Sequence, residues 1–174
     1  RSIQKRLKET YPEYMFSFHD SMEEAKSELP QADILITYGS GLTDELIERA
    51  ERLKWIMVIS AGIDGLPLQA IKERNILVTN VTGIHKIPMA EYTIAMMIEA
   101  VKHIKRWHEN ERKHVWKQYS DMNEISGKTL AVLGTGAIGS EIARLAQVFH
   151  MKTLGLNRSG RSVEYFDEIY TNDQ

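Results

Sequence analysis

The chain has 174 residues with a formal net charge of −2, and 43% of its residues are hydrophobic and 26% charged. This composition is typical of a globular chain with one ordinary domain or two small lobes, and the balanced charge argues against nucleic acid and acidic membrane surfaces as partners. Cysteine is absent, which excludes disulfides and thiolate metal sites. No run approaches the roughly 18 apolar residues of a membrane span, and no leader is recognisable. We therefore expect a cytoplasmic protein.

Short apolar runs alternate with helix-like segments along most of the chain. Ser21 with Glu24 three residues later predicts a capped helix over 22–29, and Thr43 predicts the cap of a helix over 44–53. Strands that alternate with helices favour an α/β fold, in which a parallel sheet is covered on both sides. The predicted strands are 15–18, 33–37, 55–60, 76–80, 129–134 and 152–157.

One long connecting helix is predicted from Pro88 to about Gln118. Pro88 fits a first helical turn, and the apolar residues that follow on nearly all sides, as far as Ile104, are typical of a helix buried between layers. This helix follows a first lobe, over residues 1–84, and opens a second, over 85–174. Both ends of the chain resemble interrupted elements, so we expect a piece of a longer protein whose first lobe lacks its N-terminal strand.

Three glycines stand between a predicted strand and an amphipathic segment. Gly134 permits a tight turn, Gly136 lets the backbone approach a pyrophosphate, and Gly139 lets a helix lie close to the strand. The unpaired N–H groups near Ala137 and Ile138 would face the phosphates at the positive end of the helix dipole. The pattern predicts a dinucleotide-binding site, and the alternative is a tight turn that binds no ligand.

The end of the next predicted strand bears on which dinucleotide is bound. An NAD site has an acidic residue there, about 20 positions after the glycines, to hold the ribose hydroxyls. This chain has Asn157, followed by Arg158, Ser159 and, close by, Arg161. Arg and Ser side chains can hold a 2′-phosphate that an Asp would repel, so we expect NADP in preference to NAD. The alternative is that these are ordinary polar residues of a loop.

Three segments together resemble the D-isomer-specific 2-hydroxyacid dehydrogenase family, and within it the glyoxylate and hydroxypyruvate reductases. They are VISAGIDGLPLQAIKERNILVTNVTG (58–83), MAEYTIAMMIEAVKHI (89–104) and ISGKTLAVLGTGAIGSEIARLAQVFHMKTLGLNRSG (125–160), in the order and spacing of the family. The resemblance implies a flavodoxin-like substrate lobe, followed by the first part of a doubly wound Rossmann nucleotide-binding domain.

The resemblance also implies which residues bind the substrate. Backbone N–H groups of Ala61, Gly62 and Ile63 would hold a substrate carboxylate, and Gly39 occupies the matching position on the neighbouring strand, where a plain turn glycine is the alternative. The catalytic Arg, Glu and His of the family belong to segments beyond this chain, so we expect the fragment to be inactive. The complete protein would be a homodimer that transfers a hydride between a nicotinamide and C2 of a small 2-oxo or 2-hydroxy acid.

Two other functions fit the same fold, because a fold does not fix a function. One is a non-catalytic dinucleotide-binding regulator, similar to the corepressors of this family. The other is an adenosylhomocysteine hydrolase-like enzyme, against which the short first lobe and the lack of cysteine argue. No HExxH pattern occurs among the six histidines, so no metal site is expected, and His85 is the histidine nearest the expected cleft.

Overall fold

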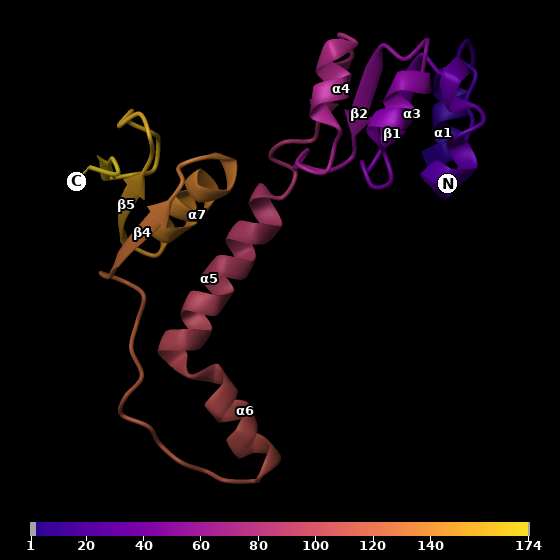
Figure 1. Ribbon diagram of the computed structural model, residues 1–174. Coiled ribbons are helices and arrows are strands. Elements are labelled where there is room, and N and C mark those ends of the chain that lie inside the picture. Colours follow the sequence, from indigo (N-terminus) through magenta and orange to yellow (C-terminus); the bar gives the residue numbers. More distant parts are fainter. Residues whose placement is uncertain (1–2, 174) are drawn as a thin grey trace. The chain divides into compact units, whose positions relative to one another are not determined.

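The computed structural model describes residues 3–173, and the chain divides into two units, Arg1–Thr82 and Gly83–Gln174 (Figure 1). Each unit contains a parallel sheet, with strand order β1-β2-β3 in the first and β4-β5-β6 in the second. The predicted α/β class is therefore confirmed. No helix within residues 3–173 combines the length and the apolar character needed to cross a membrane.

The first unit alternates strands and short helices. The hydroxyl of Ser21 accepts a hydrogen bond from the Glu24 N–H (3.3 Å), and that of Thr43 accepts one from the Leu46 N–H (3.3 Å), so both predicted caps are confirmed. The elements are α1 (Ile3–Thr10), α2 (Met22–Ala25), a 3₁₀ turn (Leu29–Gln31), β1 (Ile34–Thr37), α3 (Asp44–Arg49), β2 (Trp55–Val58), α4 (Leu68–Glu73) and β3 (Leu77–Asn80).

The core of the first unit lies around the central strand. Ile56 and Val58 of β2 and Ile47 of α3 are fully buried, as expected for a strand that has neighbours on both sides. All three strands run parallel, so their carboxyl ends meet at one edge of the sheet. The loops that follow β1 and β2 start at this edge and carry the predicted substrate-binding residues.

The prediction of a strand over residues 15–18 is wrong, because this segment is irregular. Phe16 and Phe18, which alternate as they would in a strand, stack on each other with ring centroids 6.0 Å apart, and the side chain of Met15 is exposed. Four alternating residues are too few to specify a strand when no neighbouring strand offers hydrogen bonds.

In the second unit, a helix that covers the sheet packs against the long helix that opens the unit. α5 and α7 lie against each other, and α7 also contacts β4 and β5. Ala90 of α5 and Ala143 and Ala146 of α7 are fully buried, and small side chains of this kind let helices approach closely. The elements are α5 (Lys86–Lys102), α6 (Ile104–Arg112), β4 (Thr129–Leu133), α7 (Ala137–Val148), β5 (Lys152–Leu156) and β6 (Glu168–Tyr170).

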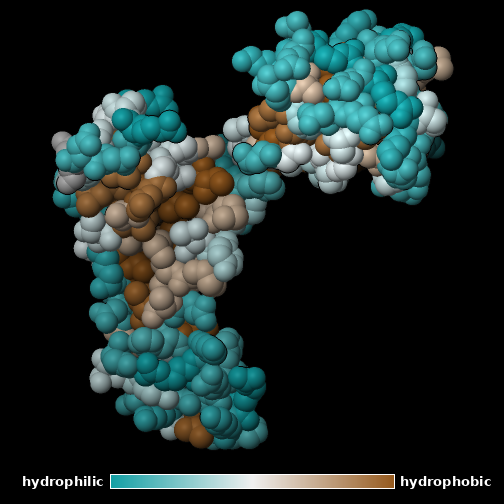
Figure 2. Space-filling view, viewed as in Figure 1, coloured by the Kyte–Doolittle hydropathy of each residue, from teal (hydrophilic) through white to brown (hydrophobic). Residues whose placement is uncertain are grey.

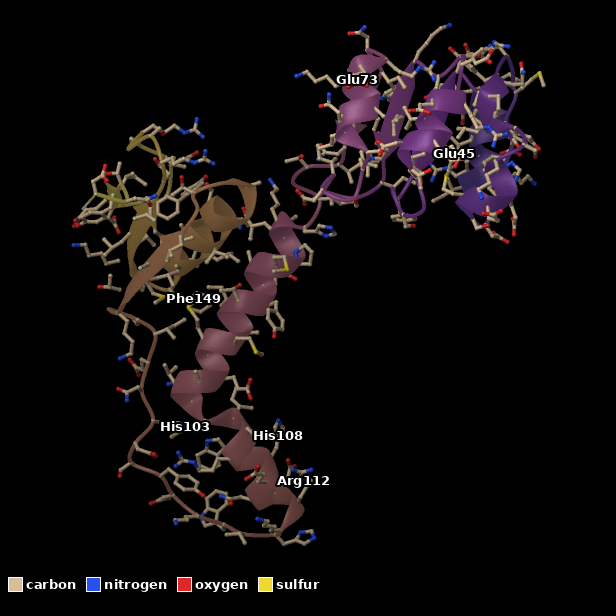
Figure 3. The ribbon with its side chains drawn as sticks, viewed as in Figure 1. Glu45, Glu73, His103, His108, Arg112 and Phe149 are labelled. Atoms are coloured by element: carbon tan, nitrogen blue, oxygen red, sulfur yellow. The ribbon has the colours of Figure 1, made fainter. Side chains whose placement is uncertain are left out.

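The prediction of one continuous helix to Gln118 is wrong. The helix breaks at His103, which has a left-handed backbone (φ 53°), and α6 ends at Arg112; the labels of His103, His108 and Arg112 mark this course in Figure 3. The Asn123 N–H donates to the Val101 carbonyl (3.0 Å), so a distant segment takes over a carbonyl at the end of α5. A contact of this kind does not show in the local pattern.

Two further expectations in this unit differ from the structure. Apolar residues of α5, among them Tyr92 and Met96, are exposed, although the pattern predicted a helix buried on nearly all sides. The strand β6 is not among the predicted strands. Three residues are too short a pattern to identify, and β6 is defined by its pairing with β5, in which Leu154 lies opposite Glu168.

Candidate functional site

The glycine loop, residues 134–139, joins β4 to α7. The local structure explains the presence of glycine differently at each of its three glycine positions. Gly134 has a left-handed backbone (φ +100°), which glycine adopts without strain. A Cβ on Gly139 would overlap the carbonyl of Gly134 and lie 3.0 Å from Val132 Cγ1. A Cβ on Gly136 would meet no described atom within 4 Å. Neither backbone strain nor packing in the described chain therefore requires glycine at position 136.

The first turn of α7 is suited to an anion. The helix begins at Ala137 with Gly136 as its N-cap, and within residues 3–173 no side chain caps it. Its first N–H groups are therefore not satisfied by a cap, and they lie at the positive end of the helix dipole. The Ser140 N–H, which donates to the Gly136 carbonyl (2.9 Å), begins the helical hydrogen bonding.

Glu141 of α7 carries a negative charge that neighbouring cations compensate. Glu141 accepts a hydrogen bond from the Arg144 guanidinium (2.7 Å), and this bond, helped by the charge of Lys86, holds the pKa of Glu141 below its ordinary value. The ion pair reduces the repulsion that the carboxylate would exert on an anion at the helix N-terminus. The segment before α5 lies close by, since a Cβ on Gly83 would be 3.9 Å from Ala137 Cβ.

The loop that follows β5, residues 157–161, lies next to the glycine loop and is tied to it. Asn157 Nδ2 donates to the hydroxyl of Thr135, a residue of the glycine loop, over 3.1 Å. The side chains of Arg158, Ser159 and Arg161 are exposed. The structure thus brings the predicted phosphate-binding and ribose-binding segments together within one unit.

In the first unit, residues 60–63 form the loop after β2, which we call the substrate loop. The hydroxyl of Ser60 donates to the Gly62 carbonyl (2.9 Å), and Asn80 Nδ2 donates to the Ala61 carbonyl (2.6 Å). Both bonds use carbonyl groups, whereas the N–H groups of Ala61 and Gly62 donate to no acceptor in the described chain. The loop therefore presents backbone donors at the carboxyl edge of the sheet.

The backbone conformation at position 39, after β1, favours glycine. Gly39 has a left-handed backbone (φ +90°), and a Cβ there would lie 3.0 Å from Leu66 Cδ2. Its N–H donates to the hydroxyl of Thr37 (3.1 Å). These contacts account for a glycine at this position without a ligand, and its part in substrate binding stays a prediction.

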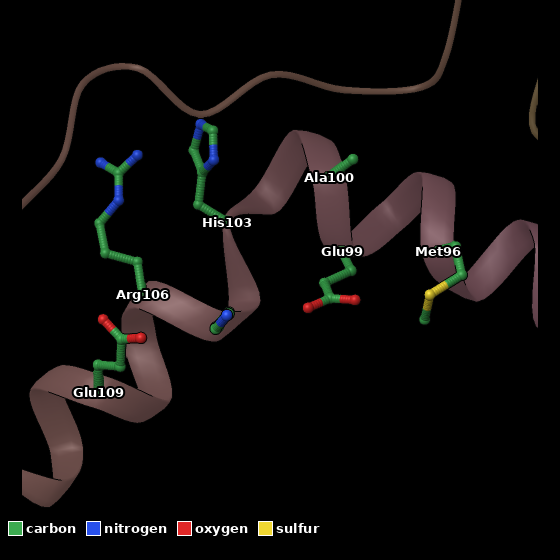
Figure 4. Close-up of a pocket in the computed structure, with 7 residues that line it drawn as sticks. Met96, Glu99, Ala100, His103, Arg106 and Glu109 are labelled. Atoms are coloured by element: carbon green, nitrogen blue, oxygen red, sulfur yellow. The ribbon is translucent and has the colours of Figure 1, made fainter.

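A surface hollow lies in the second unit, at the joint between α5 and α6 (Figure 4). Arg106 donates to both carboxylate oxygens of Asp121 (3.0 and 3.1 Å), and these bonds hold the pKa of Asp121 below its ordinary value. This ion pair fastens the segment after α6 to the helix. Charges of both signs line the hollow, so it selects no class of ligand; its residues are Met96, Glu99, Ala100, His103, Lys105, Arg106 and Glu109.

Sequence reasoning missed two residues, one in each unit: Thr135 ties the glycine loop to the 157–161 loop, and Asn80 fixes the substrate loop. Thr135 lies inside the glycine pattern, where attention falls on the glycines, and Asn80 ends β3. A polar residue at or just beyond the end of a parallel strand was an available signal, because such residues gather at one edge of the sheet. Within residues 3–173, no three His, Asp or Glu side chains are placed to bind a metal ion.

Comparison with known sequences places the chain among dehydrogenases. Residues 1–173 match the family described as D-isomer specific 2-hydroxyacid dehydrogenase, catalytic domain. The hydroxypyruvate reductase of Thermotoga maritima is 31% identical over 157 residues, which are 87% of this chain and 51% of that protein.

Two solved structures share the fold. The D-lactate dehydrogenase of Aquifex aeolicus, solved with NAD and lactic acid, has a TM-score of 0.80 at 28% identity, over 97% of this chain and 52% of that one. An acyclic imino acid reductase, solved with NADPH and D-Arg, has a TM-score of 0.78 at 30% identity, over 95% of this chain and 55% of that one. The chain spans about half the length of these proteins, and the predicted Rossmann-like α/β architecture is confirmed.

Proposed function

Because the chain belongs to the D-isomer specific 2-hydroxyacid dehydrogenase family, we propose that the full-length protein is a nicotinamide-dependent oxidoreductase. It interconverts small 2-oxo and 2-hydroxy acids. The hydroxypyruvate reductase among the relatives supports glyoxylate- or hydroxypyruvate-like substrates.

The observation that carries the proposal is the open space beside Gly136. Gly134 and Gly139 have conformational or packing reasons within the chain, but a Cβ on Gly136 would occupy only space in front of the uncapped turn of α7. A pyrophosphate that approaches this backbone closely supplies the missing reason for glycine. The glycine loop therefore fits a dinucleotide.

Each part of the chain then has a binding task. The N–H groups of Ala137 and Ile138 hold the pyrophosphate, and those of Ala61, Gly62 and Ile63 hold the substrate carboxylate. The bound nicotinamide supplies or accepts the hydride. The acid/base and carboxylate-binding side chains that the family uses are not assigned to residues of this chain, and the 174 residues alone are expected to be inactive.

We propose NADP as the preferred dinucleotide. Position 157 carries Asn and no acidic side chain, and the exposed Arg158, Ser159 and Arg161 supply donors for a 2′-phosphate. The similar imino acid reductase was solved with NADPH, and the similar lactate dehydrogenase with NAD, so related folds bind either.

We also propose that the protein is a homodimer through the exposed apolar face of α5. Tyr92 is 61% exposed, and Figure 2 shows apolar side chains gathered over α5 and α7 of the second unit. A patch of this kind is typical of an interface. The large hydrophobic residues of α5 that are exposed are Ile87, Met89, Tyr92 and Met96.

The test is an assay of the full-length protein with NADPH or NADH and a panel of glyoxylate, hydroxypyruvate and pyruvate, following nicotinamide absorbance. We expect faster oxidation of NADPH with at least one acid. The Gly136→Val variant, which places a branched side chain in the open space, should lose dinucleotide binding and activity together. Binding of the dinucleotide without turnover of any acid would instead favour the non-catalytic regulator.

A further inference from the structure

Asn157 stands where an NAD site has its acidic side chain. All hydrogen bonds that its carboxamide can form are made to other residues of this chain. Its two N–H donors are taken, because Nδ2 donates to Thr135 Oγ1 (3.1 Å) and to the Arg161 carbonyl (3.0 Å). Its oxygen accepts from both the N–H (3.1 Å) and the hydroxyl (3.2 Å) of Ser159. An amide has two donors and two acceptor lone pairs, so this side chain has no capacity left for ribose hydroxyls.

The same bonds give the 157–161 loop its shape. The Arg161 N–H donates to the hydroxyl of Ser159 (3.4 Å), Gly160 has a left-handed backbone (φ +64°), and the Asn157 N–H donates to the Tyr170 carbonyl (3.0 Å). The loop is a tight turn closed around one side chain. Arg158 follows Asn157 directly, and Arg161 ends the loop and accepts one of the bonds that close it, so the backbone positions of both arginines depend on this closure.

Thr135 is a firm anchor for this loop. It is 6% exposed, and its carbonyl accepts a hydrogen bond from the Ser140 hydroxyl (3.2 Å) of α7. Its methyl group fills the space above Gly155, where a Cβ would lie 2.7 Å away. A side chain fixed in this way can hold a loop in place through one hydrogen bond, whereas an exposed one could move with it.

We propose that Asn157 is a positioning residue, which couples the glycine loop to the 157–161 loop through Thr135 and so holds Arg158 and Arg161 in place to bind the 2′-phosphate. Asn157 does not itself contact the adenosine ribose. The inference rests on the proposed preference for NADP, and it assigns that preference to the arginines and to a hydrogen bond beneath them.

The test compares two variants of Thr135, which touches neither ribose nor phosphate in this proposal. Thr135→Val keeps the shape of the side chain and removes the acceptor, whereas Thr135→Ser keeps the acceptor. Titration of the full-length protein with 2′-AMP and 5′-AMP should show 2′-AMP binding weakened about fivefold to tenfold in the valine variant, since about one hydrogen bond is lost. The serine variant should bind like the wild type, and 5′-AMP should change less than threefold.

A second variant addresses the direct-contact alternative. If Asn157 faced the ribose, Asn157→Asp would strengthen the binding of 5′-AMP, because the carboxylate could accept a hydrogen bond from its 2′-hydroxyl. The proposal expects weaker 2′-AMP binding without any gain for 5′-AMP, because Asp cannot donate to Thr135 or to the Arg161 carbonyl. Tighter 5′-AMP binding by this variant, or equal 2′-AMP binding by the valine and serine variants, would overturn the proposal.

The outcome also separates this proposal from the one on which it rests. If the wild type binds 2′-AMP and 5′-AMP equally, the preference for NADP fails. If the wild type instead prefers 2′-AMP but the valine and serine variants bind 2′-AMP equally, the positioning role alone fails. Thermal unfolding of each variant identifies a loss of binding that follows from unfolding.

Discussion

Gly139 in the first turn of α7 packs so closely against Gly134, the residue after β4, that a Cβ on Gly139 would overlap the Gly134 carbonyl. Because backbone cannot move aside cheaply, we expect Gly139→Ala to lower the free energy of unfolding by about 1–3 kcal/mol. Gly136→Ala is the matched control: its Cβ meets open space and its φ is −78°, so its stability should stay within about 0.5 kcal/mol of the wild type.

The same two variants distinguish a glycine needed for folding from one needed for dinucleotide binding. In a titration of the full-length protein with NADPH, Gly136→Ala should weaken binding by about tenfold or more, because the added methyl group stands where the pyrophosphate approaches. Unchanged affinity in the Gly136→Ala protein, with normal thermal unfolding, would contradict the proposed role of the open space.

The carboxylate of Asp167 accepts hydrogen bonds from the Thr153 N–H (2.7 Å) and the Thr153 hydroxyl (3.0 Å). The backbone bond, with the hydroxyl bond second, holds the pKa of Asp167 below its ordinary value. Since the pKa is lower in the folded state, the stabilisation is complete above the ordinary Asp value of about 3.9 and is lost as the pH falls through the folded-state value.

We therefore expect Asp167→Asn to lower Tm at pH 7 and to approach the wild type as the pH is reduced below about 4. Thermal unfolding followed by circular dichroism between pH 3 and pH 7 measures this convergence. Asp20→Asn, a change at an exposed residue of the other unit, is the control. A Tm difference that does not vary with pH would show that the charge of Asp167 contributes nothing.

Arg74 caps the end of α3 from the end of α4. Its guanidinium donates to the carbonyls of Ile47, Glu48 (3.2 Å) and Glu51 (3.0 Å). Arg74→Ala leaves these groups without their donor and should cost about 1–3 kcal/mol in denaturant unfolding. Arg74→Lys should recover only part of the lost stability, because an ammonium lacks the planar, several-donor geometry of the guanidinium. Arg49→Ala breaks an exposed pair with Glu45, whose position is labelled in Figure 3, and should have little effect.

Asn80 fixes the substrate loop through the Ala61 carbonyl, and its own oxygen accepts from the Thr82 hydroxyl (2.8 Å). In the full-length protein, if it has the proposed activity, Asn80→Ala should raise KM for the 2-oxo acid about fivefold or more while the affinity for NADPH stays unchanged, because the freed loop no longer presents its N–H groups. Thr82→Val, one bond further away, should have a smaller effect. A rise in the NADPH dissociation constant alone would place Asn80 outside substrate binding.

The exposed face of α5 should hold two copies of the protein together. Tyr92→Glu combined with Met96→Glu places charges on this face and should convert a dimer into a monomer in sedimentation equilibrium. Ile3→Glu, at a residue of α1 that is 74% exposed, is the control and should leave the dimer intact. A monomeric wild type, or a double variant that stays dimeric, would contradict the proposed interface.

The sequence alone determined the features that arise from local patterns. Alternating apolar runs and capping residues predicted the α/β class, the helix caps at Ser21 and Thr43, and the strand–glycine–helix order around Gly134, because hydrogen-bonding and backbone preferences act over a few neighbouring residues. The resemblance of three segments to family patterns likewise predicted the family from the sequence alone.

Tertiary structure decided what depends on distant partners. The break at His103, the short strand β6 and the irregular path at residues 15–18 follow from contacts with segments far along the chain, or from the lack of such contacts. The bond from Asn157 to Thr135 joins residues 22 positions apart, so only folding shows that the carboxamide is fully occupied. A residue type indicates what a side chain can bond, and its neighbours in space determine what it does bond.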